Sequence, residues 1–209
     1  MRKHLTNFDL KVIAIITMTL DHMGYYLFPF DDWFRIVGRI AMPIFAFLCA
    51  ETFRYTRDKK AYALRMLVCG VVYTLVRFYV EPNGTGDIFL TLALGFLMLW
   101  GLEEKQYLIT ASAFIIGVLV PVDYYWYGLC MVPMMYYLKE KKLAMLLVMM
   151  GMNVLLVSTS NVHPMQYYSI LSIFLIWLYN NQVGCKKWKY FFYIYYPVHV
   201  VILAAIAWL

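Results

Sequence analysis

The stretch Leu10-Lys-Val-Ile-Ala-Ile-Ile-Thr-Met-Thr-Leu-Asp-His-Met-Gly-Tyr-Tyr26 places an ionisable pair, Asp21 and His22, inside an otherwise apolar run. A run of this kind is typical of a membrane-spanning helix, and a charged side chain at the centre of such a helix costs roughly 3 kcal/mol. Ionisable residues in that position usually mark a reaction site or a transport pathway. The pair therefore predicts both a membrane fold and a buried polar site.

The composition of the whole chain supports a membrane protein. Of its 209 residues, 64% are hydrophobic and only 14% are charged, whereas a soluble domain is about half apolar and one-quarter charged. We expect an all-α, polytopic integral membrane helical bundle, a single transmembrane domain over residues 1–209 in the cell (plasma) membrane. The net charge of +6 does not predict a nucleic-acid partner, because the basic residues lie at the ends of apolar runs. The four cysteines lack the spacing of a metal site or a disulfide framework, so neither is predicted.

About nine transmembrane helices are predicted from apolar runs that polar segments separate. The predicted spans are residues 10–30, 36–56, 61–80, 88–102, 107–120, 123–138, 143–158, 165–179 and 190–208. The short spans 88–102 and 107–120 could instead form a re-entrant pair. With nine spans, every Lys and Arg except Arg35, Arg39 and Arg77 lies on the side of the N-terminus. This asymmetry predicts that the N-terminus lies inside the cell.

Three ionisable groups from different spans are predicted to share the middle and outer half of the membrane. At about 1.5 Å per residue, His22, His199 and Arg39 lie roughly 18, 14 and 24 Å from the inner face. We expect them to face one another, because contact with lipid would be less favourable. Adjacent residues of a helix do not face each other. Asp21 is therefore expected to be the counter-ion of Arg39, which leaves His22 to accept a proton.

Several nearby residues have simpler interpretations. A membrane-embedded histidine such as His199 can be a purely structural hydrogen-bonding group between helices. Pro43 and Pro197 each leave a backbone carbonyl without its helical partner, which either lines a polar cavity or marks a kink. Glu51, near the inner end of the second span, is expected to form a snorkelling ion pair with Arg54 one turn away.

These residues carry a resemblance to a known family. The motifs are Asp21-His-x-Gly24, then Arg35-x-x-Gly-Arg-Ile-Ala-x-Pro-Ile-Phe-Ala-Phe47, and finally Phe192-Tyr-x-x-Tyr-Pro-Val-His199. With further matches around Glu51, Asn83 to Gly95 and Asp123 to Gly128, the sequence resembles the TraX family of integral membrane proteins over nearly its whole length. That family is linked to N-terminal acetylation of conjugative pilin. It is also similar, more distantly, to transmembrane acyltransferases that use cytosolic acetyl-CoA and an intramembrane histidine.

The resemblance implies an acetyl-CoA-dependent membrane acetyltransferase acting on an amine or hydroxyl, such as a peptide N-terminus or a glycan-like molecule. Acetyl transfer needs a general base and a group that stabilises the oxyanion. We expect His22 to be the base, Asp21 and Arg39 an orienting pair with Arg39 near the oxyanion, and His199 a second donor or proton relay. Candidate ligands for the CoA phosphates are the basic residues at the inner end of the second and third spans: Arg54, Arg57, Lys59, Lys60 and Arg65. Each of these can equally be a topology signal alone.

Two other functions remain open from the sequence. A proton-coupled transporter or flippase could relay protons through Asp21, His22 and His199, although no internal repeat of the kind common in transporters is found. A non-catalytic assembly factor could bind a partner helix within the membrane, although the glycines do not form a small-residue face. Such a factor would tolerate asparagine or glutamine at His22.

Overall fold

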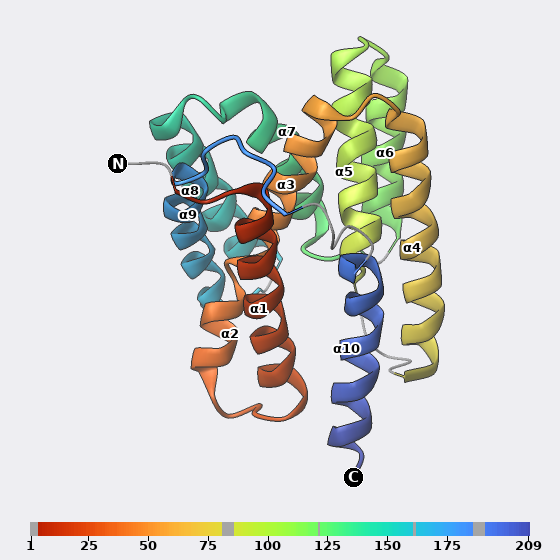
Figure 1. Cartoon of the computed structure of the whole chain (residues 1–209), viewed down its shortest axis with the longest axis vertical. Coiled ribbons are helices and arrows are strands. Elements are labelled where there is room, and N and C mark those ends of the chain that lie inside the picture. The colour runs from red at the N-terminus through yellow and green to blue at the C-terminus, as the bar shows by residue number, and fades with distance from the viewer. Residues whose placement is uncertain (1–3, 81–85, 121, 161, 186–190) are drawn as a thin grey trace. The chain divides into compact units, whose positions relative to one another are not determined.

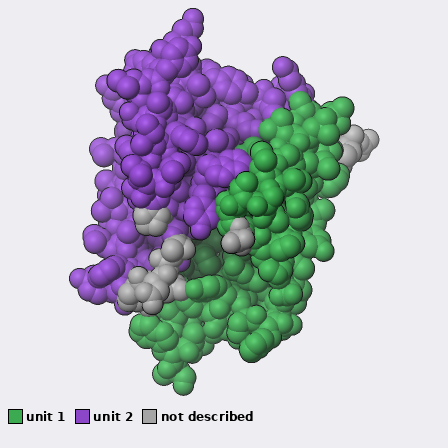
Figure 2. Space-filling view, turned by 180° about the vertical axis from the view of Figure 1, so that it is seen from behind, with its two compact units in different colours: residues 1–45, 142–209 green, residues 46–141 purple. Residues whose placement is uncertain are grey.

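A computed structural model describes residues 4–80, 86–120, 122–160, 162–185 and 191–209. This part of the chain is helical, and it contains no strand beyond a single isolated bridge between Leu5 and Tyr179. The residues cluster into two compact units, one formed by 1–45 with 142–209 and the other by 46–141 (Figure 2). Each unit is described by itself.

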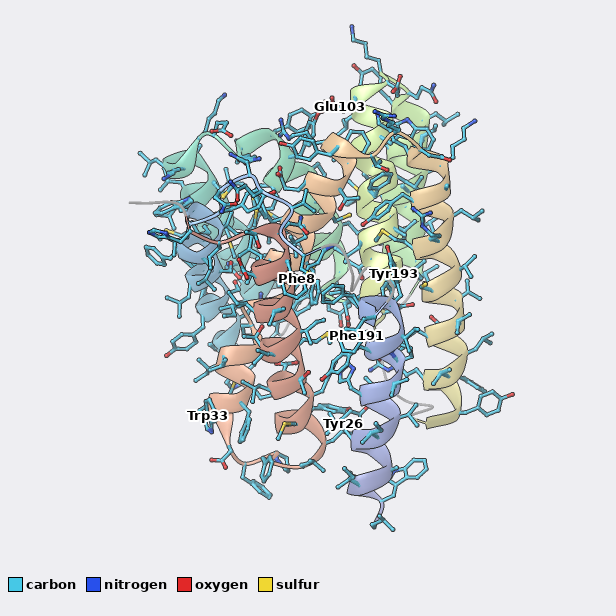
Figure 3. The ribbon with its side chains drawn as sticks, viewed as in Figure 1. Phe8, Tyr26, Trp33, Glu103, Phe191 and Tyr193 are labelled. Atoms are coloured by element: carbon cyan, nitrogen blue, oxygen red, sulfur yellow. The ribbon has the colours of Figure 1, made fainter. Side chains whose placement is uncertain are left out.

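The first unit, unit 1, joins the two ends of the sequence. It contains α1 (Asn7–Tyr26), α2 (Asp32–Gly38), the start of α3 (Ala41–Tyr55), α8 (Lys142–Thr159), the 3₁₀ helix η1 (Pro164–Leu171), α9 (Ser172–Trp177) and α10 (Phe191–Ala207). Helix α1 packs against both α2 and α10, while η1 packs against α8, α9 and α2. In Figure 1, α1 and α10 run in the same direction. Figure 3 labels Tyr26 at the end of α1, and Phe191 and Tyr193 at the start of α10.

Helix α1 begins at Asn7, before the apolar run itself, because several groups satisfy its first N–H donors. Thr6 and Asp9 form a capping box, in which each side chain accepts a hydrogen bond from the other residue's backbone. The N–H groups of Asn7 and Phe8 donate to carbonyls of the segment 178–184. Satisfying the first donors in this way stabilises a helix start. The same contacts tie the N-terminal segment to the approach to α10.

The second unit, unit 2, is built around α5 (Ile88–Glu103). The rest of α3 and the helices α4 (Lys59–Val80), α6 (Tyr107–Leu119) and α7 (Tyr125–Leu138) complete it. Helix α5 packs against α4, α6 and α7. Its residues are apolar on every face and most are buried, as expected for a central helix. Gly95 allows the close approach of α7, since a Cβ there would lie 2.9 Å from Val132.

The predicted spans agree with most helix positions but miss one interruption. The span predicted over 36–56 is divided into α2 and α3 by a turn at Arg39 and Ile40. Pro43 explains the break, because it has no N–H to bond the Arg39 carbonyl and its ring crowds that carbonyl. Pro197, by contrast, lies inside the uninterrupted helix α10.

The prediction of one helix over 165–179 is wrong. The segment forms the 3₁₀ helix η1 and then the six-residue helix α9. Its polar residues explain the difference: Gln166, Ser169 and Ser172 follow one another at a spacing of three and are all buried. A helix with three residues per turn aligns them in one row, whereas in an α-helix they would fan out over an arc of about 120°.

Three stretches of the described chain are long and apolar enough to cross a membrane: Asp32–Tyr55, Lys59–Tyr79 and Lys142–Thr159. The helices Ile88–Glu103, Tyr107–Leu119 and Phe191–Ala207 are apolar but shorter. The nine crossings and the internal N-terminus remain predictions. Of the basic residues counted for that orientation, Arg2, Lys3, Lys186, Lys187 and Lys189 lie outside the described residues.

The cap of α5 should make the stability of unit 2 depend on pH. Asp87 accepts hydrogen bonds from the N–H groups of Phe89 and Leu90 and from the hydroxyl of Thr74, yet only 2% of the residue is exposed. Burial raises the pKa of the Asp87 carboxyl from 3.8 to about 6. Between these values the folded chain holds a proton that the unfolded chain releases. The free energy of unfolding should therefore fall as the pH rises from about 4 to 6, by up to about 3 kcal/mol.

This effect can be isolated with Asp87→Asn, since asparagine is also a good N-cap but does not ionise. The melting temperature of the purified protein should change less between pH 4.5 and 7 in the variant than in the wild type. Equal pH dependence in the two proteins would contradict the assignment.

Candidate functional site

The clearest cluster of ionisable groups in unit 1 is a pair of histidines between α1 and α10. His22 Nδ1 lies 2.7 Å from His199 Nε2, and the ring centroids are 4.9 Å apart. His199 is 5% exposed, and the buried Tyr196 packs edge-on against both rings. The prediction that His22, His199 and Arg39 face one another is confirmed for the two imidazoles, whereas Arg39 is paired with Asp21.

The hydrogen bonds fix which nitrogen of each neutral imidazole carries the proton. His199 Nδ1 lies 3.0 Å from the carbonyl oxygen of Tyr195. A carbonyl only accepts, so Nδ1 of His199 carries the hydrogen and its Nε2 is an acceptor. His22 must then donate from Nδ1, which leaves the lone pair of His22 on Nε2. The pair therefore has a direction: His199 orients His22, and His22 Nε2 is the basic atom.

A second interaction, one helical turn away, supports this pair. The Thr19 hydroxyl donates to the Ile15 carbonyl at 2.8 Å, so it accepts at 2.9 Å from the Tyr195 hydroxyl. The Tyr195 ring also stacks on His199, with an interplanar angle of 9°. Thr19 precedes His22 by three residues and Tyr195 precedes His199 by four. The two contacts therefore form successive rungs between helices that run in the same direction, and we expect them to set the register of α1 against α10.

Removing the hydrogen bond between Thr19 and Tyr195 should weaken the packing of α1 on α10 while both histidines remain in place. We expect Tyr195→Phe and Thr19→Val each to destabilise the protein by about 1 kcal/mol, the usual contribution of one hydrogen bond. The double variant should lose little more than either single variant, because both changes remove the same interaction. Thermal unfolding in detergent measures this, with the exposed Tyr168→Phe as the control. Fully additive losses would show that the rung does not act as a unit.

The second cluster is an aspartate held by two arginines between α1 and α2. Asp21 Oδ1 lies 2.5 Å from Arg39 Nη2, and Oδ2 lies 2.8 Å from Arg35 Nη1. Arg35 also donates to the Asp21 carbonyl at 3.1 Å. The side chains of Asp21, Arg39 and Arg35 are 13%, 11% and 31% exposed. The predicted ion pair of Asp21 with Arg39 is confirmed.

Arg35 is a member of this cluster that the sequence analysis did not assign to the site. A signal was present, because Arg35 precedes Arg39 by one turn and therefore shares its helical face. Its guanidinium also lies over the ring of Tyr25, 5.6 Å from the centroid. Two guanidinium groups and one carboxylate leave an excess of one positive charge. A cluster with this charge can stabilise an anion that forms nearby.

Two glycines allow α2 to reach the aspartate. A Cβ at Gly38 would overlap the Asp21 carboxylate, and a Cβ at Gly24 would lie 2.7 Å from the Phe34 Cβ. The Asp21-His-x-Gly and Arg-x-x-Gly-Arg motifs thus each contain a charged side chain of this cluster and a glycine that allows the close approach of α1 and α2. The two clusters lie on neighbouring faces of α1, since Asp21 and His22 are adjacent in sequence and about 100° apart around the helix.

The other predicted site residues lie in unit 2. Arg54 and Lys59 have carboxylate partners, Arg54 Nε lying 3.5 Å from Glu51 and Lys59 Nζ 3.5 Å from Glu104. The remaining three predicted ligands of CoA are exposed and make no ion pair within the described part of the chain: Arg57, Lys60 and Arg65.

The expected ion pair of Glu51 with Arg54 is present, but Glu51 does not snorkel, because it is 2% exposed. Both of its carboxylate oxygens also lie 2.8 Å from Lys139 Nζ, which is the nearer partner. Lys139 follows α7, far away in sequence, so spacing along one helix could not have identified it. A nearby contact closes the same end of unit 2, where Tyr136 and Tyr137 both donate to Glu103, which Figure 3 labels at the end of α5.

Comparison with known proteins identifies the family. The family model described as TraX protein matches residues 7–207. The chain belongs to the TraX family. Its match contains both the histidine pair and the Asp21 cluster.

Two curated proteins are similar to this TraX family member. A probable fimbrial assembly protein, FimC of serogroup H1 from Dichelobacter nodosus, is 27% identical over 232 residues, which cover 95% of this chain and 94% of the relative. An uncharacterized protein of Rickettsia prowazekii (strain Madrid E) is 39% identical over 95 residues, covering 43% of this chain and 36% of that protein. No solved structure matches the chain significantly.

Proposed function

We propose that this TraX family protein is an integral membrane acetyltransferase that moves acetyl from acetyl-CoA to an amine or hydroxyl, with His22 as the general base. The observation that carries the proposal is the directed hydrogen bond from His22 to His199. It holds an imidazole at the α1–α10 interface with its basic nitrogen, Nε2, defined by the tautomer. A neutral histidine is the side chain best suited to accept a proton near pH 7.

The reaction that this arrangement supports is a direct acyl transfer. The nitrogen or oxygen of the acceptor forms a bond to the acetyl carbonyl carbon while its proton passes to His22 Nε2. The carbonyl oxygen then carries the negative charge of the tetrahedral intermediate, for which the excess positive charge of Arg35 and Arg39 is suited. Collapse of the intermediate breaks the bond between carbon and sulfur, and the proton on His22 passes to the CoA thiolate. In this scheme His199 orients His22 and shares its positive charge.

The direction of the helices supports the proposed membrane topology. If α1 and α10 both cross the bilayer, two helices that run the same way must be separated by an odd number of crossings. The predicted nine spans meet this condition, with seven crossings between the first and the last. We therefore retain the internal N-terminus and a multi-pass location in the cell membrane as part of the proposal.

For the phosphates of CoA we propose Arg57, Lys60 and Arg65 as the principal ligands. They are exposed, and no carboxylate neutralises them within the described residues. Arg54 and Lys59 are weaker candidates, because Glu51 and Glu104 already pair with them. Arginine is the side chain that best matches the geometry of a phosphate.

The proposed acceptor of the acetyl group is inferred from the name of a similar protein, and not from the geometry of the site. Because the Dichelobacter nodosus relative is named as a fimbrial assembly protein, we propose a surface-assembled peptide with a free N-terminus as the first acceptor to test. A glycan-like hydroxyl compound is the second.

Binding and transfer can be tested separately on the purified protein. Acetyl-CoA should raise the melting temperature progressively with concentration, because it binds the folded state, whereas acetate and ATP together should not. With protein in vesicles, labelled acetyl should appear on a supplied acceptor peptide. Absence of both effects would overturn the proposal.

A non-catalytic role in fimbrial assembly is the second candidate, and the name of the Dichelobacter nodosus relative favours it directly. It predicts normal assembly without acetyl-CoA. The His22 substitution described in the Discussion separates the two functions.

A further inference from the structure

Unit 1 contains a buried row of polar side chains that the proposed reaction does not use. In a 3₁₀ helix, residues three apart lie directly above one another. Gln166 and Ser169 in η1 and Ser172 at its C-cap therefore follow one face, over roughly 12 Å at about 2 Å per residue. All three residues are 0% exposed. An uncharged polar row of this length inside an apolar unit needs an explanation.

Part of the row is satisfied by the fold. The Ser169 hydroxyl donates to Asn153 Oδ1 at 3.0 Å, and Asn153 Nδ2 donates to the Met149 carbonyl at 2.9 Å. Asn153, in α8, is also 0% exposed. This central contact holds η1 against α8.

The two ends of the row have no partner among the described residues. Gln166 Oε1, Gln166 Nε2 and Ser172 Oγ are buried atoms without a hydrogen bond to any part of the chain that the structure describes. Leaving such groups unpaired costs about 1–3 kcal/mol each, whereas apolar side chains of the same size would cost nothing of this kind. A stability requirement alone would favour methionine and alanine at these positions. The presence of these polar groups is therefore better explained by a ligand that forms hydrogen bonds with them.

The chemistry of the row defines what that partner must be. The residues carry no charge, so they cannot neutralise a phosphate or a carboxylate, which require cationic or multiple charge-assisted donors. The carboxamide of Gln166 presents an acceptor and a donor side by side. A secondary amide presents the complementary donor and acceptor. Ser172 adds a hydroxyl that can serve a second polar group farther along the same ligand.

We propose that the η1 row of Gln166, Ser169 and Ser172 binds the secondary amide of a neutral ligand. Two sources share this chemistry: the backbone of a peptide and the pantetheine arm of CoA, which contains two amides. Helix η1 packs against α2, which contains Arg35 and is followed directly by Arg39. A ligand on the row would therefore lie against the helix whose arginines pair with Asp21. The inference does not depend on acetyl transfer, because amide binding can occur in a protein of any of the functions considered.

The test measures the melting temperature of the full-length protein in detergent with two neutral probes. One is N-acetyl-alanine methylamide, for which methyl O-acetyl-lactate, in which esters replace both amides, is the matched control. The other is pantetheine. At least one amide probe should raise the melting temperature with increasing concentration, and the ester should raise it less than its amide counterpart. A response to the peptide probe alone or to pantetheine alone identifies the source of the amide.

Three variants locate the binding. Gln166→Met and Ser172→Ala should each weaken the response at least tenfold, while Thr159→Val, at an exposed hydroxyl of α8, should leave it unchanged. Gln166→Met should also melt higher than the wild type without any probe, because it removes the unpaired carboxamide. Ser172→Ala, which removes a single oxygen, keeps the test valid if methionine does not pack.

The proposal is overturned if neither amide probe stabilises the wild type, or if the response survives in both row variants. Because no acetyl transfer is measured, failure here leaves the proposed transferase function standing, and failure of that function leaves amide binding standing.

Discussion

Replacing His22 by glutamine is expected to lower the rate of acetyl transfer by about 10²- to 10⁴-fold, the contribution of a positioned general base. The side-chain amide of glutamine can still donate a hydrogen bond to His199 Nε2, so it can replace the bond that His22 forms between α1 and α10. It cannot accept the proton that the mechanism places on His22 Nε2. Transfer of labelled acetyl in vesicles measures the effect, and stabilisation by acetyl-CoA should persist.

The matched control is His4→Gln, the same substitution at an exposed histidine outside the helices. It should transfer acetyl at the wild-type rate. Wild-type transfer by His22→Gln would remove His22 as the base. If assembly of surface fibres in the host is normal in His22→Gln although acetyl transfer is lost, the non-catalytic assembly role is the better explanation.

Replacing Asp21 by asparagine should give the largest loss of stability, because it leaves two guanidinium groups without their carboxylate. Breaking a buried ion pair by removing one partner typically costs 3–5 kcal/mol. The partial exposure of Arg35 reduces its share of this cost, and Arg39, at 11% exposure, should dominate it. A marked decrease in the melting temperature is expected in detergent, whereas Asp31→Asn, at an exposed aspartate, should change it little.

A compensating substitution makes this prediction sharper. Adding Arg39→Met to Asp21→Asn removes the more buried of the two unpaired charges, so the double variant should be more stable than Asp21→Asn alone. If Asp21→Asn is as stable as the wild type, the ion pairs do not hold α2 against α1. Transfer activity in the double variant should still be low, since the Arg39 guanidinium that the mechanism uses for the oxyanion is lost.

The helical periodicity of single segments accounts for what the sequence predicted well. The depths of His22 and His199, estimated from their distances along separate apolar runs, led to the correct expectation that they meet. The opposite charges of Asp21 and Arg39, at similar depth in the predicted membrane, likewise led to the correct expectation that they form an ion pair. Here the cost of placing polar groups among apolar ones leaves few arrangements, so composition alone restricts the partners.

The features that the sequence did not predict depend mostly on contacts between elements that are distant along the chain. Lys139 replaces Arg54 as the main partner of Glu51, and no spacing within one helix indicates it. The interruption at Arg39 and Ile40 and the 3₁₀ form of Pro164–Leu171 are also departures from a continuous helix. In η1, Gln166, Ser169 and Ser172 follow one another at a spacing of three, which is compatible with both a 3₁₀ helix and an α-helix. The sequence therefore did not indicate which of the two forms over 165–179.

The sequence by itself determined that the chain is helical and apolar, and that an aspartate and two histidines lie within its helices. It could do so because hydrophobic periodicity and the cost of burying charge act on each segment independently of the others. Only the tertiary structure decided that Tyr195 fixes the tautomer of His199, that Arg35 shares Asp21, and that Gln166 is buried with no hydrogen-bond partner among the described residues. Those facts depend on the registers of packed helices, and registers are set by side chains from several elements at once.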